Sequence, residues 1–288
     1  MDGPASFEPM GLVVETFEDI GVTRLSRWIF NCYLIHNGGD GRPLVVDPGL
    51  PGVADDLFPE MERLGMERSD LISICATHAH SDHVGGAPAI SARVDAQVYL
   101  PEFSRAYLAG STPRSPHPKA IARIWPAVFE QPLDPRGVAD AARGTRMAGY
   151  GTSAGMRWPT EVPVAYLADG EHLPGAPEWT VIATPGHTDD STSFWHEPTH
   201  TLLSGDAVLS VGGRAWITPE TVDDEASAKS SQRLCDLEVA HLLPGHGRPV
   251  HGVGLTAHAL GPDEGPRGLA TMLAGLVRCV SGRTTKAP

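Results

Sequence analysis

Four separate apolar segments of this chain each run into a histidine or an aspartate with glycine close by. The segments are LISICAT, TVIAT, TLLS and HLL, and the groups that follow them are the cluster 78–83, His187, Asp206 and His246. An imidazole or a carboxylate at the end of a buried strand costs free energy unless it is paired or bound to a metal. Because strand ends at one edge of a sheet lie close together, we expect these groups to meet in one site.

The cluster that follows LISICAT is the densest of these groups. Four potential metal ligands fall within six residues, namely His78, His80, Asp82 and His83. Imidazole nitrogens and carboxylate oxygens are the ligands that zinc and several other transition metals use in proteins. We expect the first two histidines to serve one metal centre, and Asp82 with His83 to serve a second centre beside it.

The order of apolar and polar runs predicts a layered α/β fold. Strands are expected within 11–36, at 42–49, 71–78 and 96–102, and again from 163 onward, with helices at 53–65, 85–94 and 224–236. The chain has 288 residues, of which 41% are hydrophobic, so one domain spanning residues 1–288 can bury a sizeable core. An apolar helix is predicted near the C-terminus at about 266–280.

The strand rhythm breaks over residues 104–165, which we interpret as an insertion that could act as a lid. Helical stretches are expected at 103–110 and 119–130, separated and followed by segments rich in proline and glycine. The aromatic residues of this insertion are Trp125, Phe129, Tyr150 and Trp158. Packing of these aromatics onto the body of the protein and contact with a substrate both remain open.

Charge and cysteine placement narrow the classes of function. The formal net charge of −13 argues against non-specific nucleic-acid binding. The four cysteines form no CxxC, so a disulfide framework is not expected and a reducing, cytoplasmic location fits best. Neither a long apolar run nor a signal-peptide pattern is visible, so we expect no membrane partner.

The motifs HxHxDH, PGHT, GD and PGHG occur in this order, and together they resemble the metallo-β-lactamase superfamily, in particular its glyoxalase II-like and lactonase-like hydrolases. The likeness covers roughly residues 12–102 and 163–250, including the strand that ends in Asp47. The resemblance implies a four-layer αββα sandwich, with the site on one edge between two sheets.

The resemblance also implies a role for each candidate ligand. One metal would be held by His78, His80 and His187, the other by Asp82, His83 and His246, with Asp206 bridging them. Two Zn²⁺ are the expected cofactors, although the donors also suit Fe or Mn. A water shared by the metals would be the nucleophile, with Asp82 orienting it, so Asp82 and Asp206 are the catalytic candidates.

Three other aspartates stand near the motifs. Asp47 would accept a hydrogen bond from a ligand histidine or from a loop amide, although a turn-forming role before Pro-Gly fits it equally well. Asp189 and Asp190 follow the PGHT motif directly. We interpret this pair as a solvated face or as caps of a turn.

The leading hypothesis is hydrolysis of a small-molecule ester, thioester or lactone. Asp206 stands where the best-known β-lactamases of this superfamily carry a cysteine ligand, which disfavours a true β-lactamase. Only a short segment follows His246, so the helical domain with which glyoxalase II binds glutathione is not evident, and glutathione thioesters are not expected.

Two alternatives from other reaction classes stay open. TPGHTDDS followed by SGD is similar to lactamase-like endoribonucleases, but the chain lacks a basic stripe for RNA. Persulfide dioxygenases share the scaffold with one Fe(II), which here would be held by His78, His187 and Asp206. A non-enzymatic binding role is disfavoured because no ligand of the motif set is missing.

Overall fold

The computed structural model describes residues 11–38, 41–151 and 155–266. Two large sheets make up most of the described chain. The seven-stranded sheet, in spatial order, contains β1 (Leu12–Phe17), β2 (Val22–Arg27), β3 (Phe30–Ile35), β4 (Leu44–Val46), β5 (Ser73–Cys75), β6 (Gln97–Pro101) and β7 (Val164–Leu167). The six-stranded sheet, in spatial order, contains β15 (Val250–His251), β14 (His241–Pro244), β11 (Thr201–Gly205), β10 (Thr192–His196), β9 (Ala176–Ala183) and β8 (His172–Leu173). A separate ribbon pairs β12 (Val208–Val211) with β13 (Arg214–Ile217).

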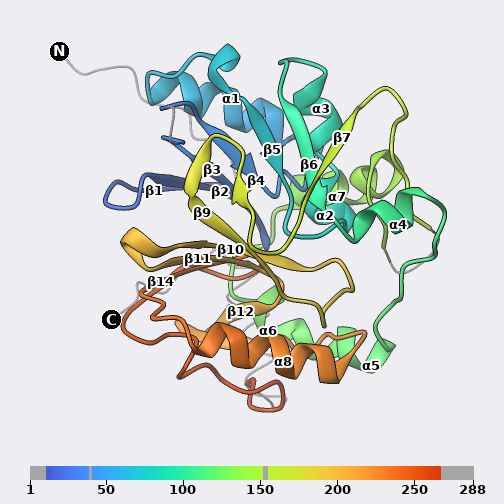
Figure 1. Cartoon of the computed structure of the whole chain (residues 1–288), viewed down its shortest axis with the longest axis vertical. Helices are drawn as coiled ribbons and strands as arrows, with labels where there is room; N and C mark the ends of the chain where they lie inside the picture. Colours follow the sequence, from blue (N-terminus) through green and yellow to red (C-terminus); the bar gives the residue numbers. More distant parts are fainter. Residues whose placement is uncertain (1–10, 39–40, 152–154, 267–288) are drawn as a thin grey trace.

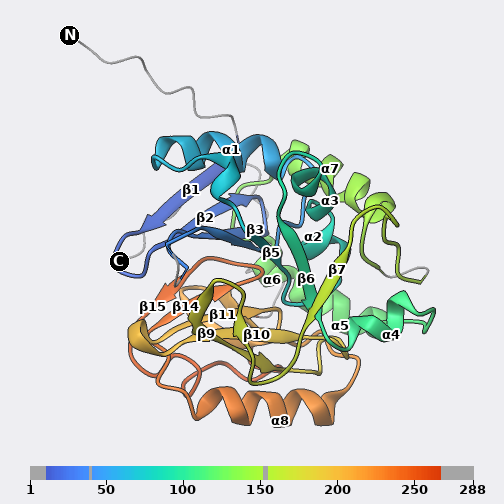
Figure 2. The ribbon, with the colours of Figure 1, turned by 45° about the horizontal axis from the view of Figure 1, so that its top comes forward.

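Helices cover the outer faces of both large sheets. The first sheet is covered by α1 (Val53–Arg63), α2 (Ser81–Val84) and α3 (Ala87–Ser91), and the second by α8 (Asp224–Cys235). Figure 1 shows α1 and α3 above the sheets and α8 below them, and Figure 2 shows the same order from a tilted view. The predicted αββα sandwich is therefore confirmed.

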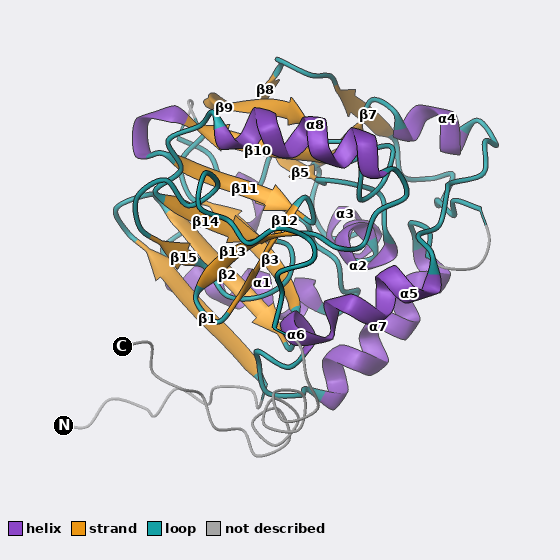
Figure 3. Cartoon of the chain, turned by 90° about the horizontal axis from the view of Figure 1, so that it is seen from below, coloured by secondary structure: helices purple, strands orange, loops and turns teal. Residues whose placement is uncertain are grey.

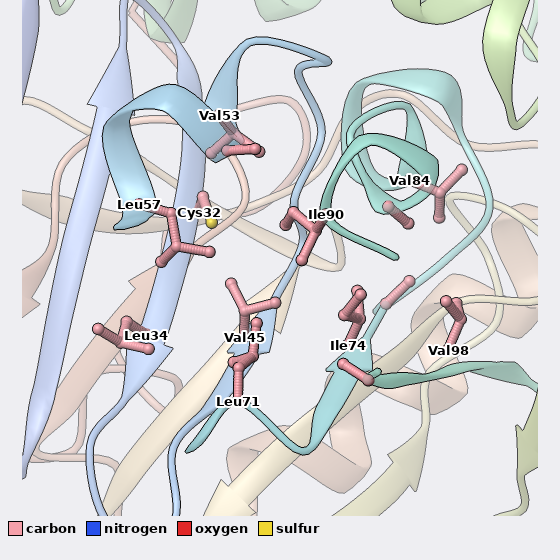
Figure 4. Close-up of a cluster of buried hydrophobic side chains, with 14 of the residues drawn as sticks. Cys32, Leu34, Val45, Val53, Leu57, Leu71, Ile74, Val84, Ile90 and Val98 are labelled. Atoms are coloured by element: carbon pink, nitrogen blue, oxygen red, sulfur yellow. The ribbon is translucent and has the colours of Figure 1, made fainter. Parts of the chain in front are cut away.

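Apolar side chains fill each boundary between these layers. Tyr33 and Val46 of the first sheet pack against Trp179, Phe194 and Leu243 of the second. On the outer face of the first sheet, Leu34, Val45 and Ile74 meet side chains of the covering helices, among them Leu57 and Ile90 (Figure 4). Burial of both faces explains why these strands are continuous apolar runs rather than alternating ones.

Strand directions bring the chemically interesting strand ends to one edge. β4 and β5 are parallel, with Val46 opposite Cys75, and β11 and β14 are parallel, with Gly205 opposite Pro244. β10 is antiparallel to both β9 and β11, so β9 and β11 also point the same way. The residues that follow β9, β11 and β14 therefore emerge at one edge of the second sheet. The segment that follows β5 lies at the same edge, since Thr192 N donates to Thr77 O at 2.7 Å.

The segment 104–165 connects β6 to β7 along the chain, and these two strands are parallel neighbours in the first sheet. It contains α4 (Ser104–Leu108), α5 (Pro118–Ile121), α6 (Trp125–Val128) and α7 (Pro135–Met147). Three short 3₁₀ helices complete the described elements, namely η1 (Arg68–Asp70), η2 (Ala122–Ile124) and η3 (Glu197–Thr199). Figure 3 shows α4, α5, α6 and α7 along one side of the molecule.

Helix α7 was not predicted, because glycines 137 and 144 disfavour a helix interior. Its start carries a recognisable signal, since Pro135 takes the first turn and the Asp134 side chain accepts from Arg136 N at 3.0 Å. Contacts with α2 lie along this helix. Tertiary packing therefore overrides the local propensity.

Most other expected elements are present with shorter bounds. The strand predicted at 71–78 is paired only over Ser73–Cys75, whereas the helix predicted at 224–236 is α8 almost unchanged. The helix predicted at 266–280 lies outside the described residues, apart from its first position. Of the cysteines, Cys32, Cys75 and Cys235 are described and are free thiols. No helix in the described part of the chain is long and apolar enough to cross a membrane.

Candidate metal centre

The loop after β5 carries the densest set of donors, and its backbone is fixed from outside. Ser81 N donates to Tyr150 O at 2.9 Å, and Tyr150 N donates to Ala79 O at 3.0 Å. These two bonds join the loop to the second half of the 104–165 insertion. The helical turn α2 then places His83 in the interior, where the side chain is 1% exposed.

Three imidazoles converge at one side of the site. Nδ1 of His80 lies 3.0 Å from Nε2 of His78 and 3.2 Å from Nε2 of His187. His187 reaches this point because Gly186 turns the chain with a φ of +143°, as expected from the PGH motif. The first set of ligands inferred from the sequence is thus brought together.

The second set meets around a carboxylate. Nε2 of His246 lies 3.3 Å from Oδ2 of Asp82 and 3.3 Å from Oδ2 of Asp206. The same oxygen of Asp206 lies 3.5 Å from Nε2 of His83 and 3.5 Å from Nε2 of His187. Asp206 therefore touches members of both sets, which is the position a bridging ligand requires.

Four of the five imidazoles are oriented by a hydrogen bond on their outer nitrogen. Nδ1 of His187 donates to Glu220 O at 2.8 Å, and Nδ1 of His246 donates to Ile29 O at 2.8 Å. Since a carbonyl oxygen only accepts, these bonds fix a proton on the outer nitrogen, so that in the neutral ring the Nε2 lone pair faces the site.

The same reasoning assigns the tautomers of His78 and His83. The Thr77 hydroxyl donates to Asp47 Oδ2 at 2.8 Å, so at 3.2 Å it accepts from Nδ1 of His78. Nδ1 of His83 donates to Asp47 Oδ2 at 2.9 Å. In the neutral form of both rings, which is the form that binds a metal, the Nε2 lone pair is left toward the site.

Asp47 is held firmly in this arrangement. Its side chain is 2% exposed, and its Oδ1 accepts from Thr77 N at 2.7 Å while Oδ2 accepts from His83. Both partners expected of it, a histidine of the site and a loop amide, are thus present at once.

The pKa values of the histidines shift in opposite directions in the two halves of the site. Burial, with neighbouring imidazoles, lowers the pKa of His78 well below its ordinary value and that of His80 to about 3. Burial opposes charge on His83 as well, but Asp206 and Asp47 raise its pKa to about 10. Burial likewise opposes ionisation of Asp206, yet His246 and His83 hold its pKa well below the usual range.

The donor set fits metal ions. Among the described residues, His83 Nε2 and Asp206 Oδ1 are buried side-chain atoms without a hydrogen-bond partner, and such atoms are costly unless something binds them. Three groups of donors have ligand atoms within 4.8 Å of one another, namely His78 with His80 and His187, His78 with His83 and Asp206, and Asp82 with His83 and His246. Neutral imidazoles and carboxylates are suited to zinc or iron.

Close backbone approach is needed where the second sheet meets the donors. A Cβ at Gly245 would lie 2.3 Å from Asp206 Oδ1 and 2.7 Å from His83 Cε1. Both distances are far below van der Waals contact, so only glycine leaves room for these donors.

One residue that supports the site, Asn31, escaped the sequence reasoning. Asn31 is 3% exposed and donates through Nδ2 to Pro244 O and Gly247 O, both at 2.8 Å, which holds the loop that carries His246. A lone polar residue in the apolar run FNCYLI was the available signal.

The interpretation of Asp190 as a solvated residue was wrong. Its exposed fraction is 1%, and its carboxylate accepts from Ala79 N and from the hydroxyls of Ser104 and Tyr150. Asp189 instead pairs with the half-exposed Arg114. Tertiary contacts from the insertion, which the sequence does not display, bury the second aspartate of the pair.

The aromatic residues of the insertion divide by role. Tyr150 is 3% exposed and packs against His80, and Trp158 packs on the core and donates to Val162 O at 2.8 Å. Trp125 and Phe129 are partly buried and contact each other, with ring centroids 5.9 Å apart. Packing onto the body of the protein thus accounts for Tyr150 and Trp158.

Comparison with known proteins agrees with this geometry. The model of the metallo-beta-lactamase superfamily matches residues 27–246, a span that includes all seven candidate ligands. The chain is 29% identical over 254 residues to the probable metallo-hydrolase YflN of Bacillus subtilis (strain 168), covering 81% of this chain and 86% of that protein.

Two further similar proteins have names or descriptions that mention a reaction or a bound metal. A hydroxyacylglutathione hydrolase of Bdellovibrio bacteriovorus is 22% identical over 183 residues, covering 62% of this chain and 49% of that protein. The crystal structure of TTHA1623 in a di-iron-bound form aligns with a TM-score of 0.51 and 26% identity, covering 82% of this chain and 96% of that one.

Proposed function

Because this chain belongs to the metallo-β-lactamase superfamily and resembles its metallo-hydrolases, we propose that it hydrolyses a small ester, thioester or lactone with two bound metal ions. The observation that carries the proposal is the convergence of inward lone pairs from four oriented imidazoles on both sides of Asp206. A binding module without chemistry would not need that many desolvated donors aimed at one another.

The proposed ligands divide as the resemblance implies. His78, His80 and His187 would hold one ion, Asp82, His83 and His246 would hold the other, and Asp206 would be shared between them. When bound, the two ions supply Lewis acidity and a water acidified toward neutral pH.

Asp82 is our candidate for orienting the water. Its side chain is 29% exposed, compared with 6% for Asp206 and 2% for Asp47, so it is the carboxylate of the site within reach of solvent. Burial opposes its ionisation, but the contact with His246 and the other nearby imidazoles hold the pKa of Asp82 below its ordinary range. It is therefore ionised at neutral pH, and as an anion it can orient a water by accepting a hydrogen bond from it.

The substrate class rests on charge and on likeness. An acidic chain of net charge −13 favours a small substrate over an RNA backbone. Hydroxyacylglutathione hydrolase, by its name, acts on hydroxyacylglutathione, which supports including thioesters. This chain spans about half the length of that relative, so the glutathione moiety itself is not part of the proposal.

Two zinc ions are the proposed cofactor, with iron as the competing metal because TTHA1623 was crystallised in a di-iron form. A mononuclear iron dioxygenase would use His78, His187 and Asp206 alone. The position of His80 Nδ1 between the other two histidines favours a site of three imidazoles, and hence the hydrolase.

The test begins with metal content. Protein purified without added metal or chelator is analysed for zinc and iron, and then assayed on matched ester, thioester and lactone substrates. About two metal ions per chain with turnover on this panel would support the proposal.

The alternatives give different results in the same preparation. One iron per chain with oxygen consumption on a persulfide would replace the hydrolase by a dioxygenase, and metal-dependent cleavage of single-stranded RNA alone would replace it by a nuclease. Asp82→Ala and His83→Ala serve as inactive controls, since both remove a proposed ligand.

A further inference from the structure

The buried carboxylate of Asp190 joins three segments that are far apart in the sequence. Its Oδ2 accepts from Ala79 N at 3.0 Å and from Ser104 Oγ at 2.6 Å, and its Oδ1 accepts from Tyr150 OH at 2.8 Å. The donors come from the loop of candidate ligands, from the start of the insertion and from the second half of the insertion. Among the described residues, Asp190 forms no salt bridge with lysine or arginine, so these hydrogen bonds are what stabilises its charge.

Ala79 is the residue between His78 and His80, and both of its backbone groups are committed. Its N–H donates to Asp190, and its carbonyl accepts from Tyr150 N at 3.0 Å. The peptide that carries the two histidines is thus held between Asp190 and the second half of the insertion. A shift of either partner would move the two imidazoles relative to each other.

His80 depends on this support more than the other four imidazoles do. Those four are oriented through hydrogen bonds on their outer nitrogens, whereas His80 turns Nδ1 inward and its Nε2 has no hydrogen bond within the described residues. The ring packs instead against the edge of Tyr150, with centroids 4.7 Å apart and planes at 70°. The Tyr150 ring is in turn held by its hydroxyl on Asp190.

We propose that Asp190 and Tyr150 are positioning residues that orient His80, so that the insertion directly supports binding of metal by His78, His80 and His187. The inference rests on the proposed metal centre and goes beyond it by making the insertion part of that centre's support. Neither residue contacts a reacting atom in this scheme. Their effect reaches the metal through the Ala79 peptide and the face of the His80 ring.

The experiment measures metal affinity rather than turnover. Metal-free wild type, Asp190→Asn and Tyr150→Phe are titrated with Co²⁺ against a competing chelator, and the visible absorption of the bound cobalt is recorded. Asp190→Asn keeps the shape of the side chain but places an amide N–H where a donor now points. Tyr150→Phe keeps the ring and the backbone bonds and removes only the hydroxyl.

The expected result is selective weakening of one of the two cobalt equivalents. Removing support from around a metal ligand typically costs roughly 10- to 100-fold in affinity, and we expect Asp190→Asn to fall in that range, with a smaller loss in Tyr150→Phe. The absorption bands of the weakened equivalent should also change. Trp158→Phe is the control, because it removes a hydrogen bond inside the insertion without touching the histidine loop; it should bind both equivalents as wild type does.

Each other outcome counts against a defined claim. Folded Asp190→Asn and Tyr150→Phe that bind both equivalents with unchanged affinity and spectra would overturn the inference, and Tyr150→Phe alone decides the matter if Asp190→Asn does not fold. Equal weakening in Trp158→Phe would reduce the effect to general destabilisation and would also overturn it. Wild type that binds no metal would refute both proposals, whereas wild type that binds two ions and hydrolyses nothing would refute only the proposed function.

Discussion

Asp47 accepts a hydrogen bond from Nδ1 of His83 at 2.9 Å while its own backbone adopts a φ of +54°. Asparagine and aspartate are the residues other than glycine that best tolerate such a backbone, because their short polar side chains bond locally. The position therefore needs both a tolerated left-handed backbone and an acceptor for the imidazole. These two requirements can be separated by substitution.

Asp47→Asn should weaken metal binding by Asp82, His83 and His246 by roughly 10- to 100-fold, because the amide no longer holds the His83 proton outward. The free energy of unfolding of the metal-free protein should fall only modestly, since asparagine accepts the same φ. Metal titration and urea unfolding measure the two effects. Asp47→Ala is the comparison: it should lose about 1–2 kcal/mol more from the strained backbone. Unchanged affinity in Asp47→Asn would show that the hydrogen bond does not tune the site.

Asp206→Ala should lower turnover at least as much as any single histidine substitution at the site. Its Oδ2 lies within 3.5 Å of Nε2 of His83, His187 and His246, so the substitution removes a donor shared by both ligand sets. Loss of several kcal/mol of electrostatic stabilisation corresponds to a fall in kcat/KM of more than about 1,000-fold. Steady-state kinetics with saturating zinc test this, and activity within about tenfold of wild type would exclude the bridging role.

Gly245→Ala should disrupt the site although it removes no donor. The added methyl would sit 2.3 Å from Asp206 Oδ1, so Asp206 or the loop that carries His246 must move. We expect reduced metal content by elemental analysis and loss of most hydrolysis. Gly155→Ala is the matched control, because no atom lies within 4 Å of the added carbon there. If both variants bind metal as wild type does, the close packing at Gly245 is not needed for the site.

Chelation should lower the thermal stability of the protein. A ligand that binds only the folded state stabilises it by about 4 kcal/mol when its concentration is 1,000 times Kd. For a chain of this size that corresponds to a fall in Tm of roughly 10 °C on metal removal. Scanning calorimetry before and after dialysis against a chelator measures the shift, and restored zinc should reverse it. An unchanged Tm would argue that the donors bind no ion tightly.

Stability should also depend on pH through His36, far from the metal ligands. Burial lowers the pKa of His36 below 6.5, opposed by Glu18 and Glu60 and assisted by Arg63, and Nε2 lies 2.7 Å from the Thr23 hydroxyl. Because the folded-state pKa is depressed, this contribution to stability is complete above about pH 6.5 and is lost as the pH falls toward the folded-state pKa. Metal-free wild type should therefore lose more stability than His36→Gln between pH 7.5 and 5.5 in urea unfolding. Parallel losses in the two proteins would contradict this.

The strands and most of the candidate site followed from local sequence. Continuous apolar runs predicted buried strands, and the histidine and aspartate at each strand end predicted one convergent site, because parallel strands deliver their ends to a common edge. Helix α7 could not be predicted from the local sequence, because glycines 137 and 144 disfavour a helix. In the folded protein, contacts with α2 outweigh that preference. The burial of Asp190 could not be predicted either, because nothing in the local sequence distinguishes a buried aspartate from an exposed one in a polar stretch.

The sequence by itself determined which donors are present, their order along the chain and the layers that carry them. Only the tertiary structure decided which nitrogen of each imidazole faces the site, since that depends on acceptors such as Ile29 O and Glu220 O that are remote in sequence. It also decided that the peptide between His78 and His80 is held by Asp190 and by Tyr150 of the insertion. Hydrophobic patterning is a local property that a linear sequence displays, whereas the partners of a buried polar group are set by which distant segments the fold brings within hydrogen-bonding distance.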